Sequence, residues 1–181
     1  MSSAGHRIIA ATDGAANRGG TAWAWTLKVP AASRDPDLPT PFLRWECAER
    51  LPEGSTAQRA EVMGLIECLE FLSSLQFSSA AYPVEVKCDS RYILCTLVEG
   101  GTGPLTFPPS GWIEGWVSRG WSRGSGGPPA HLDLWKRGYE LARRLCTDGK
   151  DITLRWVKGH AVDPDNTRAD ALAVKASLLS R

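Results

Sequence analysis

The pattern of apolar and polar positions along the chain divides it into strands and helices. Apolar residues alternate with polar ones in five segments, which predicts five strands. In four other segments apolar residues recur every three or four positions, which predicts helices. The predicted strands are Arg7–Asp13, Thr21–Val29, Phe42–Glu49, Val84–Cys88 and Ile152–Trp156. The predicted helices are about Ala57–Leu75, Ser90–Glu99, Leu132–Cys146 and Thr167–Leu179, with Ser55 or Thr56 as the cap of the first.

The order of these elements predicts an α/β fold. The first three strands form an antiparallel meander, with Pro30–Pro41 as a long hairpin loop and Gly14 ending the first strand. A helix then precedes the fourth strand, and parallel pairing of that strand with the first makes the helix a crossover. We therefore predict a five-stranded mixed sheet, three antiparallel strands followed by parallel ones, flanked by helices. We expect a single domain over residues 1–181.

Composition places the chain among ordinary globular proteins. Of its 181 residues, 43% are hydrophobic and 23% are charged, and the formal net charge is only +1. This balance excludes a disordered tail protein, and it favours neither nucleic acid nor an acidic substrate as the partner. No apolar run approaches the length of a membrane span, and no signal-peptide pattern opens the chain. We therefore expect a cytoplasmic protein without membrane contact.

The five cysteines do not follow a disulfide or metal-binding pattern. They are odd in number, and no two have the spacing of a C-x-x-C motif. We interpret them as reduced thiols that are mostly buried as small apolar side chains.

Four carboxylates lie at the ends of predicted elements. Asp13 ends the first strand and Asp89 the fourth, so parallel pairing puts them side by side at the sheet edge where α/β proteins usually hold their sites. Glu61 lies one turn inside the first helix, and Asp170 opens the last. Each acid alone is ordinarily a solvated cap or turn residue, but four together repel one another unless divalent cations neutralise them. Oxygen ligands suit Mg²⁺ or Mn²⁺, and two such ions can promote phosphodiester cleavage.

Five segments, in order, resemble the motifs of type 1 ribonucleases H of the bacterial kind, which carry a protruding handle. They are ATDGAAN (Ala11–Asn17), TAQRAEVMGLIECLE (Thr56–Glu70), CDSRYIL (Cys88–Leu94), WIEGWVSRGW with the later DLW (Trp112–Trp121 and Asp133–Trp135), and WVKGHAVDPDNTRADALA (Trp156–Ala173). The resemblance implies the ribonuclease H-like fold. It also implies an endonuclease that hydrolyses the RNA strand of RNA/DNA hybrids, leaving 5′-phosphate and 3′-hydroxyl ends. The implied cofactor is a pair of Mg²⁺ ions, which Mn²⁺ can replace.

The resemblance also assigns catalytic roles. The metal-binding acids of the family are matched by Asp13, Glu61, Asp89 and Asp170. His160 matches the histidine of the flexible loop before the last helix, which is thought to move protons or to help release product. An imidazole with an ordinary pKa near 6.5 suits either role. Without the resemblance, a lone loop histidine is more often a solvated side chain.

Further residues are candidates for binding the hybrid, and the resemblance implies that Asn17 and Thr56 help to hold DNA-strand phosphate while Gln58 contacts the RNA side. Those beside the acids are Asn17, Thr56, Gln58, Ser90 and Arg91, and those in the handle are Trp116, Arg119, Trp121 and Arg123. Short polar groups suit detection of the RNA 2′-OH, whereas tryptophan stacks on sugars or bases and arginine neutralises phosphate. Each polar residue could instead cap a helix or a loop.

Some of these positions leave alternatives open. We expect Trp112 and Trp135 in or near the core, and Trp116 and Trp121 could equally pack there. The sequence departs from the bacterial pattern at Ala57 and Arg91, which reduces the expected base-edge contacts. The arginine could contact a phosphate or sugar, or it could lie on the helix surface.

Two other functions fit the same fold. A nuclease-like module could hold hybrids or RNA without cutting them, but loss of an acid would have favoured it and none is lost. Transposases and junction resolvases keep the fold with other chemistry, but the QRAE, WIEGW and KGH segments argue against them. We expect an RNA/DNA hybrid as the partner, no obligate protein partner, and a monomer.

Overall fold

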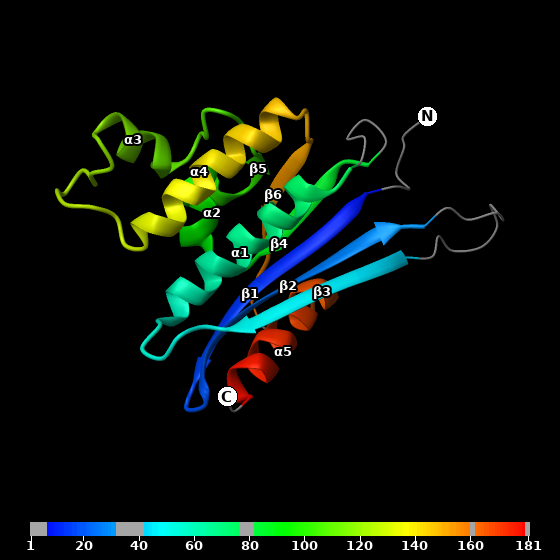
Figure 1. Cartoon of the computed structure of the whole chain (residues 1–181). Helices are drawn as coiled ribbons and strands as arrows, with labels where there is room; N and C mark the ends of the chain where they lie inside the picture. Colours follow the sequence, from blue (N-terminus) through cyan, green and yellow to red (C-terminus); the bar gives the residue numbers. More distant parts are fainter. Residues whose placement is uncertain (1–6, 32–41, 77–81, 160–161, 180–181) are drawn as a thin grey trace.

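Six strands form one sheet with helices on both faces (Figure 1) in the computed structural model, which describes residues 7–31, 42–76, 82–159 and 162–179. The strands are β1 (Ile8–Asn17), β2 (Gly20–Pro30), β3 (Phe42–Arg50), β4 (Val84–Cys88), β5 (Gly103–Pro104) and β6 (Ile152–Trp156). The helices are α1 (Ala57–Ser74), α2 (Arg91–Leu97), α3 (Trp112–Ser118), α4 (Leu132–Thr147) and α5 (Pro164–Leu178), with a 3₁₀ turn η1 (Glu99–Gly101). The predicted α/β class is confirmed.

The strand order along the sheet is β3-β2-β1-β4-β6-β5. The first three strands are antiparallel, and β1, β4 and β6 run parallel, as predicted. The predicted number of strands was wrong by one, because β5 adds an antiparallel pair to β6. A two-residue strand is too short to show an alternating pattern, so it could not be found in the sequence.

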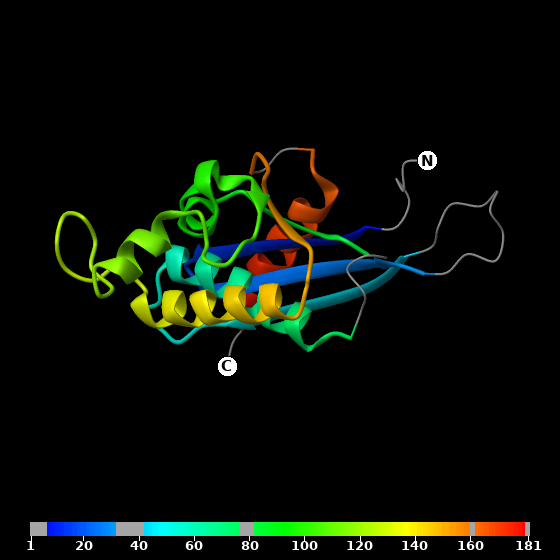
Figure 2. The ribbon, with the colours of Figure 1, turned by 90° about the horizontal axis from the view of Figure 1, so that it is seen from above.

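The helices cover the two faces of the sheet unequally. Figure 2 shows α1 and α4 on one face and α5 on the other. The larger core lies on the α1 side, where β4 contributes Val84, Val86 and Cys88, all at most 1% exposed. A smaller cluster of Ala15, Ala24 and Ala173 lies beneath α5. In the described part of the chain, no helix is long and apolar enough to cross a membrane.

Two tryptophans of the α3–α4 region differ in burial. Trp135 is completely buried, as predicted. The prediction that Trp112 also lies in or near the core was wrong, because 50% of it is exposed and its ring lies beside that of Tyr92. Trp112 is the first residue of a short helix at the surface, so its large side chain can contact one neighbour and remain solvated.

All five cysteines are free thiols, as predicted from their number and spacing. The prediction that most of them are buried was wrong, because only Cys68 and Cys88 are buried and the other three are partly exposed. Burial raises the pKa of both buried thiols to about 12, so neither forms a reactive thiolate at neutral pH.

We expected the first strand to end at Asp13, but it continues through Gly14 to Asn17. Glycine at this position allows α1 to approach β1, because a Cβ atom on Gly14 would lie 2.3 Å from the backbone nitrogen of Glu61. The glycine therefore marks a close contact between a strand and a helix, not a chain break.

The last helix starts earlier than predicted, at Pro164 instead of Thr167. Asp163 is its N-cap and accepts hydrogen bonds from the backbone nitrogens of Asp165 and Asn166, both at 3.0 Å. Proline suits the first helical position, because a backbone N–H at that position would have no intrahelical partner. The three residues before Thr167 thus belong to the first turn of α5.

Substitution of Gly14 by alanine should destabilise the fold. The added methyl group meets backbone atoms, which cannot move aside as a flexible side chain can. Overpacking of this kind costs about 1–3 kcal/mol, and each kcal/mol lowers the Tm of a chain of this size by about 2–4 °C. Thermal unfolding of Gly14→Ala measures the effect, and Gly124→Ala, at a site with no neighbour within 4 Å, is the matched control. Equal Tm values for the two variants would contradict the close contact.

Candidate active site

Asp13 and Asp89 lie at the same level of the sheet. The last paired residues of β1 and β4 are Ala11 and Lys87, and each aspartate lies two residues further along the chain, Asp13 within β1 and Asp89 directly after β4. Asp13 is 7% exposed, and its carboxylate accepts a hydrogen bond of 2.7 Å from the backbone nitrogen of Gly14. Parallel pairing thus brings two acids together from segments 76 residues apart.

Helices α1 and α5 bring the other two acids to this edge. Glu61 is the fifth residue of α1, next to the close contact with Gly14. Asp170 is the seventh residue of α5 and does not open the helix as we predicted, because the helix begins at Pro164. Both residues interact electrostatically with Asp13, so the four acids form one group, which we name the carboxylate cluster (Asp13, Glu61, Asp89 and Asp170).

Burial and mutual repulsion perturb the acids of the carboxylate cluster. The pKa of Asp13 is raised from 3.8 to about 7, mainly by burial and further by the charges of Asp89, Asp170 and Glu61, whereas the hydrogen bond from Gly14 lowers it. Burial also raises the pKa of Glu61, with a further increase from Asp89, whereas a hydrogen bond from the Ser90 hydroxyl lowers it. A buried anion among like charges is unfavourable unless a cation is present.

Trp156 and Gly159 both lie close to Asp89, the first to its backbone and the second to its carboxylate. The indole nitrogen of Trp156 donates a hydrogen bond of 2.9 Å to the carbonyl oxygen of Asp89. A Cβ atom on Gly159 would lie 2.3 Å from Oδ2 of Asp89, so a larger residue there would displace the carboxylate. We missed this supporting role of Trp156 in the sequence, where it reads only as the last residue of a strand.

The donor set fits hard divalent cations. Its members are carboxylates, and Mg²⁺ and Mn²⁺ prefer oxygen ligands. Within the described residues, no three His, Cys, Asp or Glu side chains converge closely enough to hold a metal ion by themselves. Asp13 is nevertheless buried near three other acids, and its pKa is raised first by burial and then by their charges, an unfavourable state that a bound cation would relieve. His160, the fifth predicted catalytic residue, lies outside the described residues.

Comparison with known proteins identifies the family. A profile described as RNase H matches residues 5–178. The chain belongs to the ribonuclease H family. The ribonuclease H of Paracidovorax citrulli is 38% identical to it over 122 residues, which are 67% of this chain and 68% of that protein. Ribonuclease HI of Caulobacter vibrioides is 38% identical over 66% of this chain and 65% of that protein, and the ribonuclease H of Zymomonas mobilis is 33% identical over 76% of each.

Solved structures share the fold of this ribonuclease H. LC9-RNase H1, a type 1 RNase H with the type 2 active-site motif, superposes with a TM-score of 0.68 over 98% of this chain and 74% of that chain, at 22% identity. LC11-RNase H1 in complex with an RNA/DNA hybrid superposes with a TM-score of 0.52 over 94% of this chain and 96% of that chain, at 19% identity.

The predicted hybrid-binding residues near the carboxylate cluster differ in their local roles. Asn17 caps the β1–β2 turn through a 2.8 Å hydrogen bond from Gly19, and its amide nitrogen donates to the Ser177 hydroxyl of α5. Thr56 is the N-cap of α1 and accepts a hydrogen bond from the backbone nitrogen of Arg59. Both residues are exposed, so these structural roles leave them accessible from solvent.

The remaining residues of that set also lie at the surface around the cluster. Gln58 is exposed on the first turn of α1, and Ser90 is partly exposed and bonds to Glu61. Arg91 is exposed, and its guanidinium lies 5.1 Å from the ring centre of Trp156. The stacked arginine is therefore held next to Asp89, whose carbonyl the same tryptophan binds.

The segment expected to form the handle contains α3 and the connection to α4, and it projects to one side in Figure 1. Trp116 is only 7% exposed and packs edge to face against Trp135. From this position it cannot stack on a nucleotide while the core stays closed. Trp121 is half-buried against Tyr139, whereas Arg119 and Arg123 are exposed.

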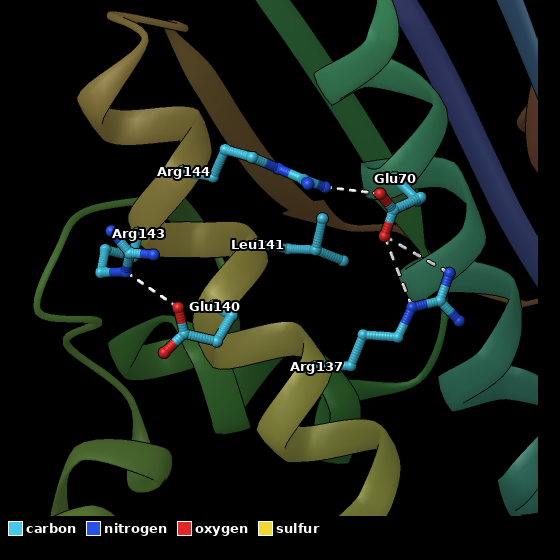
Figure 3. A pocket seen from close by; sticks show the side chains of 6 residues that line it. All are labelled: Glu70, Arg137, Glu140, Leu141, Arg143 and Arg144. Carbon is cyan, nitrogen blue, oxygen red and sulfur yellow. Dashed lines mark hydrogen bonds and ion pairs between the residues drawn. The ribbon is translucent and has the colours of Figure 1, made fainter.

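A surface pocket of about 240 Å³ lies between α1 and α4, away from every predicted site residue (Figure 3). Its arginines are paired: Arg137 and Arg144 bind Glu70 at 3.4 and 2.5 Å, and Arg143 binds Glu140 at 2.9 Å. The network joins two helices of this ribonuclease H, and its charges are already compensated.

The raised pKa of Asp13 predicts how stability depends on pH in the metal-free protein. Between the unfolded value of 3.8 and the folded value of about 7, the native state binds more protons, so the free energy of unfolding falls as pH rises. Asp13→Asn cannot release this proton, so its free energy of unfolding does not fall in the same way. Above pH 7 it should exceed that of the wild type by on the order of 2–4 kcal/mol, and below pH 4 the two should be equal.

Thermal unfolding in chelator from pH 4 to pH 8 checks this prediction. Asp151→Asn removes the same formal charge at an exposed position and controls for general charge effects. A Tm difference between Asp13→Asn and wild type that stays constant over this range would show that the carboxylate is unperturbed.

Proposed function

We propose that this ribonuclease H hydrolyses the RNA strand of RNA/DNA hybrids at the carboxylate cluster, with two divalent cations, Mg²⁺ or Mn²⁺, as cofactors. The observation that carries the proposal is Asp13, buried at the edge of the sheet with its pKa raised to about 7 among three other acids. A buried carboxylate with a raised pKa is better suited to bind a cation than to stabilise the fold. Membership of the ribonuclease H family and the relatives of that name support the reaction.

The residues of the carboxylate cluster and their neighbours have different roles in this proposal. Asp13, Glu61, Asp89 and Asp170 would hold the cations. When bound, such ions activate a water molecule and stabilise the leaving oxygen in phosphodiester cleavage. The Ser90 hydroxyl orients Glu61, and Trp156 and Gly159 fix the position of Asp89. We propose that His160 assists proton transfer or product release, which for general acid–base help is worth about 10²–10⁴-fold in rate.

The hybrid would lie across the edge that carries the cluster. We propose that Asn17, Thr56, Gln58 and Arg91 contact it near the scissile bond, because all four are exposed around the acids. Arg119 and Arg123 would neutralise phosphates from the handle, and Trp121 would contribute the exposed part of its ring. The buried Trp116 supports this surface from within. A complex with an RNA/DNA hybrid is known for LC11-RNase H1, which has the same fold.

We also propose a domain organisation, an oligomeric state and a compartment for the enzyme. We propose that residues 1–181 act as one domain and as a monomer on the hybrid, without an obligate protein partner. Five free thiols favour a reducing compartment, and the cytoplasm is the one that we propose.

A cleavage assay on three duplexes of one sequence tests the function. End-labelled RNA/DNA hybrid, double-stranded DNA and double-stranded RNA are each incubated with the protein in Mg²⁺ and in chelator. We expect cuts in the RNA strand of the hybrid alone, in Mg²⁺ alone. Asp13→Asn should abolish them while the protein stays folded, because a ligand and its charge are lost, and Asp151→Asn should cut like the wild type.

Two results would overturn the proposal. One is intact hybrid after incubation with folded wild-type protein in either metal. The other is wild-type turnover by a folded Asp13→Asn variant, which would remove the carboxylate cluster from the reaction.

A further inference from the structure

We propose that Lys87 is a positioning residue for the reaction: it fixes the start of α5 to β4 and so sets the position of Asp170 relative to Asp89. The inference rests on the proposed function, because it concerns the geometry of the same carboxylate cluster. No sequence motif of the chain singles out this lysine, and its partners are 76 and 78 residues away.

Lys87 forms a largely buried ion-pair network with the first residues of α5. Its Nζ donates to Oδ2 of Asp163 at 2.7 Å and to Oδ2 of Asp165 at 3.1 Å. The three side chains are only 12%, 22% and 5% exposed. The second oxygen of Asp165 pairs with Lys28 of β2, so the helix start is fixed to two strands. Partly buried pairs with good geometry hold their positions far better than solvated ones do.

The two acids that Lys87 binds define how α5 starts. Asp163 is the N-cap and accepts hydrogen bonds from two backbone nitrogens of the first turn, and Asp165 belongs to that turn. A cation that bridges both carboxylates restricts the rotation of the helix about its axis as well as its translation. Asp170 follows Asp163 by seven residues, which is two helical turns and about 10.5 Å on the same side of the helix. The position of the N-cap therefore determines where Asp170 lies.

The strand that carries Lys87 leads directly to Asp89, which follows its last residue, Cys88. Lys87 and Asp89 are separated by one position, which is about 6.6 Å of extended backbone. Lys87 thus joins the strand that leads into one proposed metal ligand to the helix that holds another. The segment between β6 and α5 is fixed to β4 at its other end as well, through a 3.0 Å hydrogen bond from the Val157 nitrogen to the Cys88 carbonyl.

A second ion-pair network on the same face of β4 provides the matched control. Glu85 is 6% exposed and pairs with Arg7 at 2.8 Å and with Arg155 at 3.3 Å. It lies two residues before Lys87 on the same strand, but neither of its partners belongs to α5. Glu85→Gln therefore weakens a buried pair in the same strand without releasing the helix.

The test compares Lys87→Met, Lys87→Arg and Glu85→Gln with the wild type. For each protein we would measure Tm in chelator, the increase in Tm on addition of Mg²⁺ without nucleic acid, the Mg²⁺ concentration for half-maximal cleavage, and KM for the hybrid at saturating Mg²⁺. Residues that orient metal ligands typically change metal affinity by about 10–100-fold when replaced. Lys87→Met should therefore need about tenfold more Mg²⁺ and show a smaller Mg²⁺-induced increase in Tm, with KM for the hybrid unchanged.

The other two variants separate positioning from stability. Lys87→Arg should restore most of the Mg²⁺ response, because a guanidinium can also bridge the two carboxylates. Glu85→Gln should lower Tm in chelator but keep the wild-type response to Mg²⁺.

The outcomes are distinguishable from failure of the proposed function. If Lys87→Met responds to Mg²⁺ like the wild type, the lysine has only a structural role and this inference is wrong. The same conclusion holds if the Mg²⁺ response of Lys87→Met is reduced no more than that of Glu85→Gln. If the wild type shows neither a Mg²⁺-induced increase in Tm nor cleavage, the proposed function itself fails, and the inference fails with it.

Discussion

Burial of Asp13 among three other carboxylates is the constraint on which the rest of the site depends. Asp13 is buried, and three further acids raise its pKa in addition to the effect of burial. The fold holds these groups together at a cost in stability, since each would be better solvated apart. Such a cost is retained in a protein when the strained arrangement serves a reaction. In the function that we propose, this arrangement supplies the negative potential that attracts a divalent cation.

Several local features hold this arrangement in place. The β1–β4 register aligns Asp13 with Asp89, and Gly14 allows α1 to bring Glu61 against them. On the opposite face of the sheet, Lys87 links β4 to the start of α5, which carries the fourth acid. Each of these features concerns a contact between two elements, so the site is a property of the packed fold and not of any single segment.

The difference between what the sequence predicted and what it missed follows from the range of the interactions. Strands with alternating apolar residues, such as β1 and β4, were predicted because the pattern is local. The two-residue β5 and the start of α5 at Pro164 carry no such pattern. Trp116 was ambiguous, since an amphipathic ring suits a binding surface and a core equally well, and only packing against Trp135 decides between them. The ion pair of Lys87 with Asp163 spans 76 residues and became visible only in the folded chain.

The central claim is that a divalent cation offsets the repulsion at Asp13, and a Mg²⁺ titration of the free protein tests it most directly. Thermal unfolding of the wild type and of Asp13→Asn would be followed at pH 8 without nucleic acid, from chelator to millimolar Mg²⁺. The account predicts that Mg²⁺ raises the Tm of the wild type and has much less effect on Asp13→Asn, so that the advantage of the variant in chelator shrinks. An equal response of the two proteins, or no response of the wild type, would contradict it.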